Sequence, residues 1–217
     1  MFDKIKIVIG PNDYHFHRLY FEEVNEFIIG VDSGLEYLLD FHKDIDLAVG
    51  DFDSINPDTY HKIKSKCKKI IHLEKRKNKT DLAYALEYVY ENYDYKQIEV
   101  YGGISGRIDH FIANLNLMKK YRFSLKDDYH YMFILNKGRH HIDNFKKYIS
   151  FFSIEDVYDL QLKGFKYSLD NYYLSTSDSL SVSNEGSGDL SFSKGKLLVI
   201  MSEDQRVGDK QWRKKLY

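Results

Sequence analysis

Short apolar runs alternate with helix-like patterns through the first half of the chain. Helices are indicated where apolar residues recur three and four positions apart, and buried strands where a short apolar stretch ends in glycine, aspartate or another polar residue. The strand-like runs are Ile5–Ile9, Phe27–Val31, Leu47–Val49, Ile70–Leu73 and Ile98–Tyr101. The helical patterns are Leu35–Phe41, Asp58–Lys66, Thr80–Asn92 and Ile108 to Lys120. This alternation predicts an N-terminal parallel sheet with helices on both faces, a Rossmann-like α/β/α domain.

The pattern changes after Lys126, where short strand-like runs follow one another without helical spacing. These runs are Tyr129–Leu135, Tyr148–Ile154, Val157–Leu162, Leu180–Ser183 and Leu190–Ser193. Lys194 and Gly195 then predict a hairpin turn into Leu197–Met201. Closely spaced strands of this kind predict a small antiparallel β-sandwich. We therefore expect an α/β domain over residues 1–126 and a β-sandwich domain over residues 127–217.

Composition narrows the functional classes only a little. The formal net charge is −1, so charge gives no argument for binding nucleic acid or a membrane surface. The single cysteine, Cys67, excludes an intramolecular disulfide and a cysteine-rich zinc site. The N-terminal apolar run is too short and too charged for a signal peptide, and no apolar run is long enough to span a membrane. A cytoplasmic protein is expected.

Acidic residues follow two of the predicted strands. Asp32 comes after Phe27–Val31, and Asp51 and Asp53 come after Leu47–Val49. Ligands of open α/β sheets bind at the carboxyl ends of the strands. If Asp51 and Asp53 are extended, their carboxylates lie on one side and can share Mg²⁺. The alternative is an ordinary turn, which aspartate and serine also favour.

A basic segment precedes the third predicted helix. Lys75, Arg76, Lys77 and Lys79 come just before Thr80, a candidate N-cap. Cations beside free backbone N–H groups at a helix start form an anion site, and phosphate is the expected anion. Asp81 in the first turn is a second acidic candidate, although it could simply complement the helix dipole.

A glycine-rich segment joins the fifth predicted strand to the fourth helix. Its glycines Gly102, Gly103 and Gly106 allow the backbone to approach a ligand closely. Arg107 can bind a phosphate through two hydrogen bonds, and Asp109 and His110 follow it. Asn114 lies one turn after His110 on the same helix face. The spacing matches neither the P-loop nor the dinucleotide fingerprint, so we interpret it as a different phosphate loop. By contrast, four other histidines are expected to be surface residues, because no carboxylate or cysteine stands at metal-ligand spacing from them: His15, His17, His140 and His141.

In this order, the motifs resemble the thiamine pyrophosphokinase family. The matching segments are Gly30–Gly34, Gly50–Ser54, Lys77–Asp81, Gly102–His110 with Asn114, Gly164–Leu169, Ser183–Glu185 and the strand Leu197–Met201. The resemblance covers nearly the whole chain. Two positions depart from the family pattern, because Asn78 stands where an aspartate is usual and Ser105 where another glycine is frequent.

The resemblance implies an enzyme that binds ATP and Mg²⁺ in the N-terminal domain. It implies a homodimer in which thiamine lies between this domain and the partner's β-sandwich. Catalytic and metal-binding roles are implied for Asp51, Asp53 and Asp81, and a catalytic role for Arg107. ATP-site roles are implied for the following residues: Asp32, Ser33, Gly34, Gly50, Lys79, Thr80, Gly102, Gly103, Arg107, Asp109 and His110. Thiamine-side roles are implied for Asp81, Asn114, Tyr167, Ser183 and Asn184.

These observations lead to a specific hypothesis. The thiamine hydroxyl attacks the β-phosphorus of ATP and AMP leaves, with Asp81 or Asp53 taking the hydroxyl proton. Two alternatives stay open. One is a Mg²⁺-dependent phosphohydrolase that uses Asp51 as nucleophile, and the other is a non-catalytic sensor of a nucleotide or of thiamine diphosphate.

Overall fold

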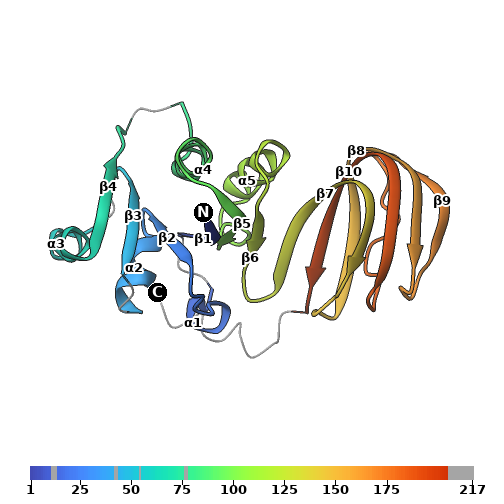
Figure 1. Cartoon of the computed structure of the whole chain (residues 1–217), viewed down its shortest axis with the longest axis horizontal. Coiled ribbons are helices and arrows are strands. Elements are labelled where there is room, and N and C mark those ends of the chain that lie inside the picture. Colours follow the sequence, from blue (N-terminus) through green and yellow to red (C-terminus); the bar gives the residue numbers. More distant parts are fainter. Residues whose placement is uncertain (11–13, 42–43, 54, 76–77, 205–217) are drawn as a thin grey trace. The chain divides into compact units, whose positions relative to one another are not determined.

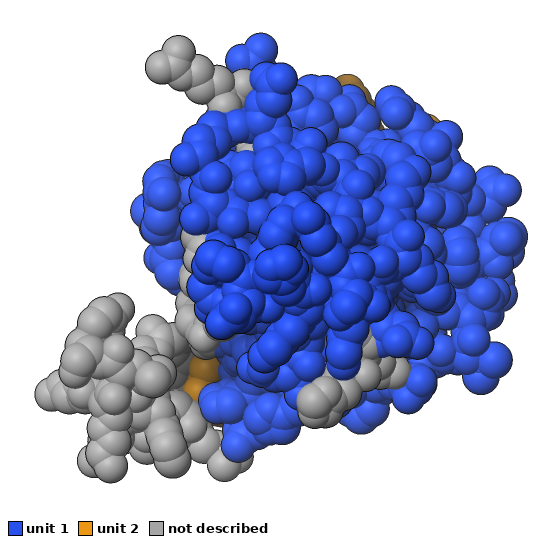
Figure 2. Space-filling view, turned by 90° about the vertical axis from the view of Figure 1, so that its left-hand side faces the viewer, with its two compact units in different colours: residues 1–128 blue, residues 129–217 orange. Residues whose placement is uncertain are grey.

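The computed structural model describes residues 1–10, 14–41, 44–53, 55–75 and 78–204 (Figure 1). Three motif residues, Ser54, Arg76 and Lys77, lie outside the described residues, as does the C-terminal segment 205–217. The chain divides into two compact units, Met1–Asp128 and Tyr129–Tyr217, which Figure 2 colours separately. The change of sequence pattern predicted a division after Lys126. None of the described helices is long and apolar enough to cross a membrane.

Unit 1 is a parallel α/β domain, as predicted. Its sheet has the strand order β4-β3-β2-β1-β5-β6, and all of its strand pairs are parallel. The strands are β1 (Phe2–Ile9), β2 (Glu26–Val31), β3 (Ile45–Gly50), β4 (Cys67–His72), β5 (Tyr95–Tyr101) and β6 (Ser124–Lys126). The helices are α1 (Phe16–Leu19), α2 (Gly34–Asp40), α3 (Pro57–Lys66), α4 (Asp81–Asn92) and α5 (Ile108–Lys120). Only α1 and β6 were not predicted, because both are too short to show a periodic pattern.

Helices cover both faces of this sheet (Figure 1). Alternate residues of each strand point to opposite faces, so the apolar strands β1, β2 and β3 supply two cores. One core joins Val8, Ile28 and Ala48 to α1, α2 and α3. On the other face, α4 presents a buried apolar stripe and packs against β2 and β3. The stripe consists of Leu82, Ala83, Ala85, Leu86 and Val89.

Unit 2 is antiparallel, and its strands are longer than predicted. They are β7 (His130–Ile142), β8 (Tyr148–Lys163), β9 (Leu169–Leu174) and β10 (Gly188–Ser202), in the order β7-β10-β8-β9. The predicted hairpin at Lys194-Gly195 is wrong, because β10 continues through it with a register irregularity between Phe192 and Lys196. Gly195 has φ +99°, and a Cβ there would lie 2.3 Å from the Asp156 carbonyl oxygen. The glycine therefore forms a bulge inside a single strand.

A register irregularity likewise joins two other predicted strands into one observed strand. Tyr148–Ile154 and Val157–Leu162 are both parts of β8, whose pairing with β10 also shifts register near Lys196. Bulges bend a strand, and apolar residues from both ends of β8 and β10 meet in one core that includes Ile149, Phe151, Leu160 and Leu162. The antiparallel half is thus a bent sheet that encloses its own core. Leu180–Ser183 is not a strand, although Ser181 accepts a backbone hydrogen bond from Phe151.

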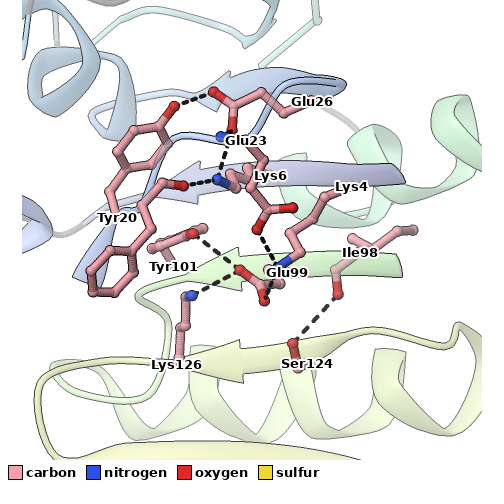
Figure 3. Close-up of polar contacts among 11 residues, drawn as sticks. Lys4, Lys6, Tyr20, Glu23, Glu26, Ile98, Glu99, Tyr101, Ser124 and Lys126 are labelled. Atoms are coloured by element: carbon pink, nitrogen blue, oxygen red, sulfur yellow. Dashed lines mark hydrogen bonds and ion pairs between the residues drawn. The ribbon is translucent and has the colours of Figure 1, made fainter. Parts of the chain in front are cut away.

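Charged side chains are buried on the α1 face of the unit 1 sheet (Figure 3). Lys6 is 1% exposed, and its Nζ lies 2.6 Å from Glu26 Oε2. Glu99 pairs with Lys4 at 3.1 Å and with Lys126 at 2.8 Å, and Tyr101 donates a hydrogen bond to it. Burial alone would raise the pKa of Glu99, but the two lysines outweigh burial and hold its pKa below the ordinary value. The network ties β1, β2, β5 and β6 together.

Stability should therefore fall in acid. A carboxyl whose pKa is lowered by folding stabilises the fold above its unfolded-state pKa, near 4.5, and loses that contribution as pH falls through the lower folded-state value. We expect Glu99→Gln to lower the free energy of unfolding at pH 7 by about 3 kcal/mol, because it leaves the largely buried Lys126 without its carboxylate partner, whereas Lys4 keeps its pair with Glu23. The same variant should lose less stability than the parent protein between pH 5 and pH 3.

Urea unfolding across this pH range measures both effects. Glu91→Gln is the control, since Glu91 is an exposed glutamate on α4. An equal loss in the two variants at pH 7 would contradict a stabilising role of the network.

Candidate functional site

The carboxyl edge of the parallel sheet collects most of the residues singled out in the sequence. Because β1 to β6 run in one direction, their C-terminal ends and the segments that follow them share this edge. The long helices α3, α4 and α5 begin on the same side, since each follows the end of a strand. Their N-terminal backbone N–H groups give this edge a positive electrostatic character that suits phosphate groups.

Close backbone packing shapes the edge at Asp32. Asp32 has φ +45°, a conformation that aspartate tolerates better than most residues. A Cβ built on Gly50 would come within 2.0 Å of Asp32 Oδ1, so the carboxylate rests directly on this glycine. Likewise, a Cβ on Gly34 would lie 2.2 Å from the Val8 carbonyl oxygen, and Ser33 Oγ occupies the space beside Gly10. Gly34 is therefore required for α2 to begin this close to the end of β1, and Gly50 leaves the space that the Asp32 carboxylate occupies.

Asp51 and Asp53 lie in a turn, so the extended geometry considered for them is wrong. Phe52 has φ +57° and is buried against Tyr60 and His72. The backbone N–H of Asp53 donates to Asp51 Oδ1 at 3.3 Å, which is typical of an Asx turn. Burial of the Phe52 ring forces this turn. It still leaves both carboxylates at the carboxyl edge of β3, only two residues apart.

The basic segment after β4 reaches the same place. Lys75 Nζ lies 2.6 Å from Asp53 Oδ2, and both side chains are largely accessible to solvent. Thr80 is confirmed as the N-cap of α4, since its Oγ1 accepts from the N–H of Ala83. Asp81 is the first residue of that helix. Lys79, in contrast, pairs with Glu87 on the side of α4, and would have to leave this partner to bind a phosphate.

The glycine loop is held open by its neighbours. Gly102 and Gly103 have φ +89° and +74°, and a Cβ on Gly102 would meet the Tyr14 ring at 2.5 Å. Asn114 is 5% exposed, and its amide donates to the Gly103 carbonyl at 2.9 Å. The structure therefore gives Asn114 a role in supporting the loop, whereas direct contact with thiamine stays a prediction.

Arg107, Asp109 and His110 lie at the start of α5 and are exposed. Arg107 forms two contacts with Asp109, at 3.1 Å through Nε and 2.5 Å through the terminal nitrogen. The hydrogen bond from Arg107 holds the pKa of Asp109 below its usual range. The backbone N–H of His110 also donates to Asp109. This arrangement orients the guanidinium at the helix N-terminus, where an incoming phosphate could replace Asp109 as its partner.

The three candidate thiamine-side residues of unit 2 lie together. Asn184 is 1% exposed and makes two hydrogen bonds with the Tyr167 backbone, donating to its carbonyl at 2.7 Å and accepting from its N–H at 2.9 Å. Tyr167 is 58% exposed, and Ser183 has φ +58°. The N–H of Ser183 donates to Ser150 Oγ. Asn184 therefore fixes the Tyr167 backbone next to the segment that carries Ser183, and both Tyr167 and Ser183 are exposed.

Two contacts at the carboxyl edge escaped the sequence reasoning. The Tyr14 hydroxyl lies 3.0 Å from the carbonyl oxygens of both Ile9 and Tyr101, so it bridges the ends of β1 and β5. His15 is exposed, as expected, but it has a carboxylate partner that no spacing in the sequence indicated, and so has His141, which pairs with Asp189. Asp128 accepts from the His15 backbone at 2.9 Å and pairs with its Nδ1 at 3.0 Å. The partners are 113 residues apart, and no motif links them.

The donor chemistry at this edge fits a magnesium–nucleotide complex. In the part of the chain that the structure describes, no three His, Cys, Asp or Glu side chains are grouped closely enough to hold a metal ion by themselves. Mg²⁺ usually keeps several waters and binds phosphate oxygens with only one or two carboxylates. Asp51 and Asp53, two residues apart in an open turn, supply such a partial ligand set, and Asp81 begins the neighbouring helix.

These features define a class. An α/β domain with carboxylates, a glycine loop and an oriented arginine at the carboxyl edge of its sheet, followed by an antiparallel unit, is typical of an enzyme that acts on phosphate groups. Comparison with known proteins identifies the family. Residues 19–129 match the model of the thiamin pyrophosphokinase catalytic domain, and residues 138–197 match that of the thiamin pyrophosphokinase vitamin B1 binding domain. The chain belongs to the thiamin pyrophosphokinase family.

Individual relatives agree with this assignment. The chain is 36% identical over 190 residues to the thiamine pyrophosphokinase of Bacillus subtilis (strain 168). The matched region covers 81% of this chain and 87% of the relative. The crystal structure of thiamine pyrophosphokinase from Bacillus subtilis superposes with a TM-score of 0.82 at 32% identity, covering 94% of this chain and all of the other. A thiamin pyrophosphokinase structure from Geobacillus thermodenitrificans gives 0.82 at 31% identity, with coverage of 93% and 98%.

The role of Asn114 can be tested against Asn116 on the same helix. Asn116 is exposed, so alanine at either position brings the same gain in helix propensity. We expect Asn114→Ala to lower the free energy of unfolding by about 1–3 kcal/mol relative to Asn116→Ala, because the buried Gly103 carbonyl loses its donor. Because the loop is loosened, the KM for ATP should also rise in Asn114→Ala. Equal stability and equal KM in the two variants would contradict the supporting role.

Proposed function

We propose that this chain transfers the diphosphoryl group of ATP to the hydroxyl of thiamine, giving thiamine diphosphate and AMP, with Mg²⁺ as cofactor. Family membership supports this activity. The observation that carries the proposal from the structure is the carboxyl edge of unit 1. There, the Asp51–Asp53 turn, the Asp32 carboxylate on Gly50, the glycine loop and Arg107 follow neighbouring parallel strands.

Binding of ATP is proposed to use backbone donors more than side chains. The glycine loop and the N-termini of α4 and α5 offer N–H groups to the phosphates, and Arg107 exchanges Asp109 for a phosphate oxygen. Asp51 and Asp53, with Asp81, would hold Mg²⁺. When bound, this ion neutralises charge on the phosphate oxygens and fixes their geometry.

In the reaction, the thiamine oxygen forms a bond to the β-phosphorus while the bond from that phosphorus to the α,β-bridging oxygen breaks. AMP leaves with the electron pair, and the hydroxyl proton passes to a carboxylate, Asp53 or Asp81. Positioning and charge neutralisation supply most of the acceleration in such transfers. Arg107 stabilises the charge that develops on the transferred group.

The thiamine side of the site is proposed to come from unit 2. Tyr167 offers an exposed aromatic ring, and Ser183 and Asn184 hold the surface beside it. We further propose a homodimer in which this surface belongs to the partner of the subunit that binds ATP. A cytoplasmic location is proposed with it.

A product assay tests the reaction class. Purified protein is incubated with ATP and Mg²⁺, with and without thiamine, and the products are separated by chromatography. AMP and thiamine diphosphate should appear together and only when thiamine and the metal are both present. Phosphate release without AMP would instead support a phosphohydrolase, and ligand binding without turnover would support a sensor.

The acidic turn can be tested with a closely matched pair of variants. Asp53→Asn should lower turnover at least about a hundredfold, in line with the loss of a single electrostatic group at an active site. Asp3→Asn is the control. Asp3 pairs with Lys96 at 2.5 Å, is 46% exposed, and so resembles the Asp53–Lys75 pair, where Asp53 is 43% exposed. Asp3 lies at the start of β1, on the opposite edge of the sheet. Near-parental turnover in Asp53→Asn would remove Asp53 from the mechanism.

A further inference from the structure

A polar pocket lies on unit 2, apart from the residues assigned above. It has a volume of 470 Å³, within the range of pockets that bind small molecules. Its walls come from β7, β8 and β10 and include Arg139, His141, Gln161, Lys163, Asp189 and Ser191. Tyr167, Ser183 and Asn184 are not among the residues that line it.

The register of the sheet explains how these side chains meet. Ser191 pairs with Arg139 on one side and Gln161 on the other, and Asp189 pairs with His141 and Lys163. The intervening residues Leu190 and Leu162 are buried in the core of unit 2. Because side chains alternate between faces along a strand, both polar rows point away from that core. They form two adjacent rows of three on the outer face of the sheet.

The pocket carries uncompensated positive charge. Asp189 is the only acidic residue among the described residues that line it, and His141 Nδ1 lies 2.6 Å from Asp189 Oδ1. The hydrogen bond with Asp189, helped by the charge of Asp143, raises the pKa of His141. Neither Arg139 nor Lys163 forms an ion pair with any described residue. In a chain of net charge −1, two unpaired cations at one pocket indicate an anion as the missing partner.

The hydrogen-bond donors that line the pocket indicate which kind of anion it can bind. A guanidinium, an ammonium, a side-chain amide and a hydroxyl of the lining residues all offer hydrogens to a ligand. Arg139 and Lys163 lie on strands that flank β10 on opposite sides, two residues apart along it, so their Cα atoms are roughly 12 Å apart and their long side chains can converge on one group or on two linked groups. Arginine also matches phosphate geometry through paired hydrogen bonds.

We propose that this pocket binds the phosphate group of a small phosphorylated molecule, a phosphate ester or a diphosphate. The residues that line the pocket all belong to unit 2, none of them is assigned a role in the proposed reaction, and the site does not depend on that reaction. Arg139 and Lys163 provide the charge, and Gln161 and Ser191 provide neutral donors between them.

Residue-resolved NMR of the full chain tests the proposal, because it separates this pocket from any phosphate site in unit 1. Inorganic phosphate, inorganic diphosphate and glycerol phosphate are titrated separately at constant ionic strength, with sodium chloride as the comparison salt. We expect saturable shifts at the Gln161 side-chain amide and the His141 ring with at least one phosphate compound. The expected dissociation constant is below about 1 mM. A preference among the three probes identifies a free phosphate, a diphosphate or an ester as the ligand type.

Two double variants decide whether the charges act locally. Arg139→Gln with Lys163→Gln should weaken the binding seen at Gln161 and His141 at least about tenfold, as expected for lost charge-assisted hydrogen bonds. Lys62→Gln with Lys66→Gln removes the same charge from exposed positions on α3 and should leave the affinity unchanged. The amide spectra of both variants confirm that the fold is retained.

Three results would overturn the proposal. Shifts that do not saturate, or that sodium chloride reproduces, would show general screening of exposed charges. Equal weakening in the two double variants would show that only net charge matters. The thiamine-dependent formation of AMP is a separate measurement, so failure of this proposal leaves the proposed reaction untouched.

Discussion

The parallel pairing of β1 on both sides is the constraint on which the candidate site depends. β1 pairs with β2 in one direction and with β5 in the other, so the chain leaves β1 toward one side of the sheet and later returns to the opposite side. Crossovers diverge at such a point, and ligands of open α/β sheets bind in the resulting crevice. Here the Tyr14 hydroxyl bridges the ends of β1 and β5, and the Tyr14 ring packs on Gly102. The Tyr14 ring, held by these two hydrogen-bonding contacts, therefore supports the start of the glycine loop at Gly102.

The buried ion pairs act on the same strands. Lys6 and Glu26 join β1 to β2, and Glu99 joins β5 to β1 and β6 through Lys4 and Lys126. Apolar residues of similar size could stabilise these positions as well, since burying charge carries a large desolvation penalty. Ion pairs differ in requiring one partner at one register. We infer that the network helps to fix which strands become neighbours, and so which segments meet at the carboxyl edge.

Sequence patterns predicted the parallel half well because each element carries its own signal. Every predicted strand and helix of unit 1 is present, and Thr80 caps α4 as expected. The antiparallel half was less predictable, since a bulge such as that at Gly195 looks the same in sequence as a turn, and only pairing with β7 and β8 shows that the strand continues. The Phe52 turn depended on burial of its ring, and the His15–Asp128 pair joins residues far apart in sequence. These features arise from tertiary contacts, and local periodicity carries no information about them.

The contact between Asp32 and Gly50 also limits how this family can change over evolutionary time. Any side chain at position 50 would occupy the space of the Asp32 carboxylate, and Asp32 itself occupies a backbone conformation that few residues tolerate. A substitution at position 50 therefore displaces the Asp32 side chain, and a substitution at position 32 removes the carboxylate that fills the space above Gly50. Among divergent relatives, the two should therefore be retained or replaced as a pair.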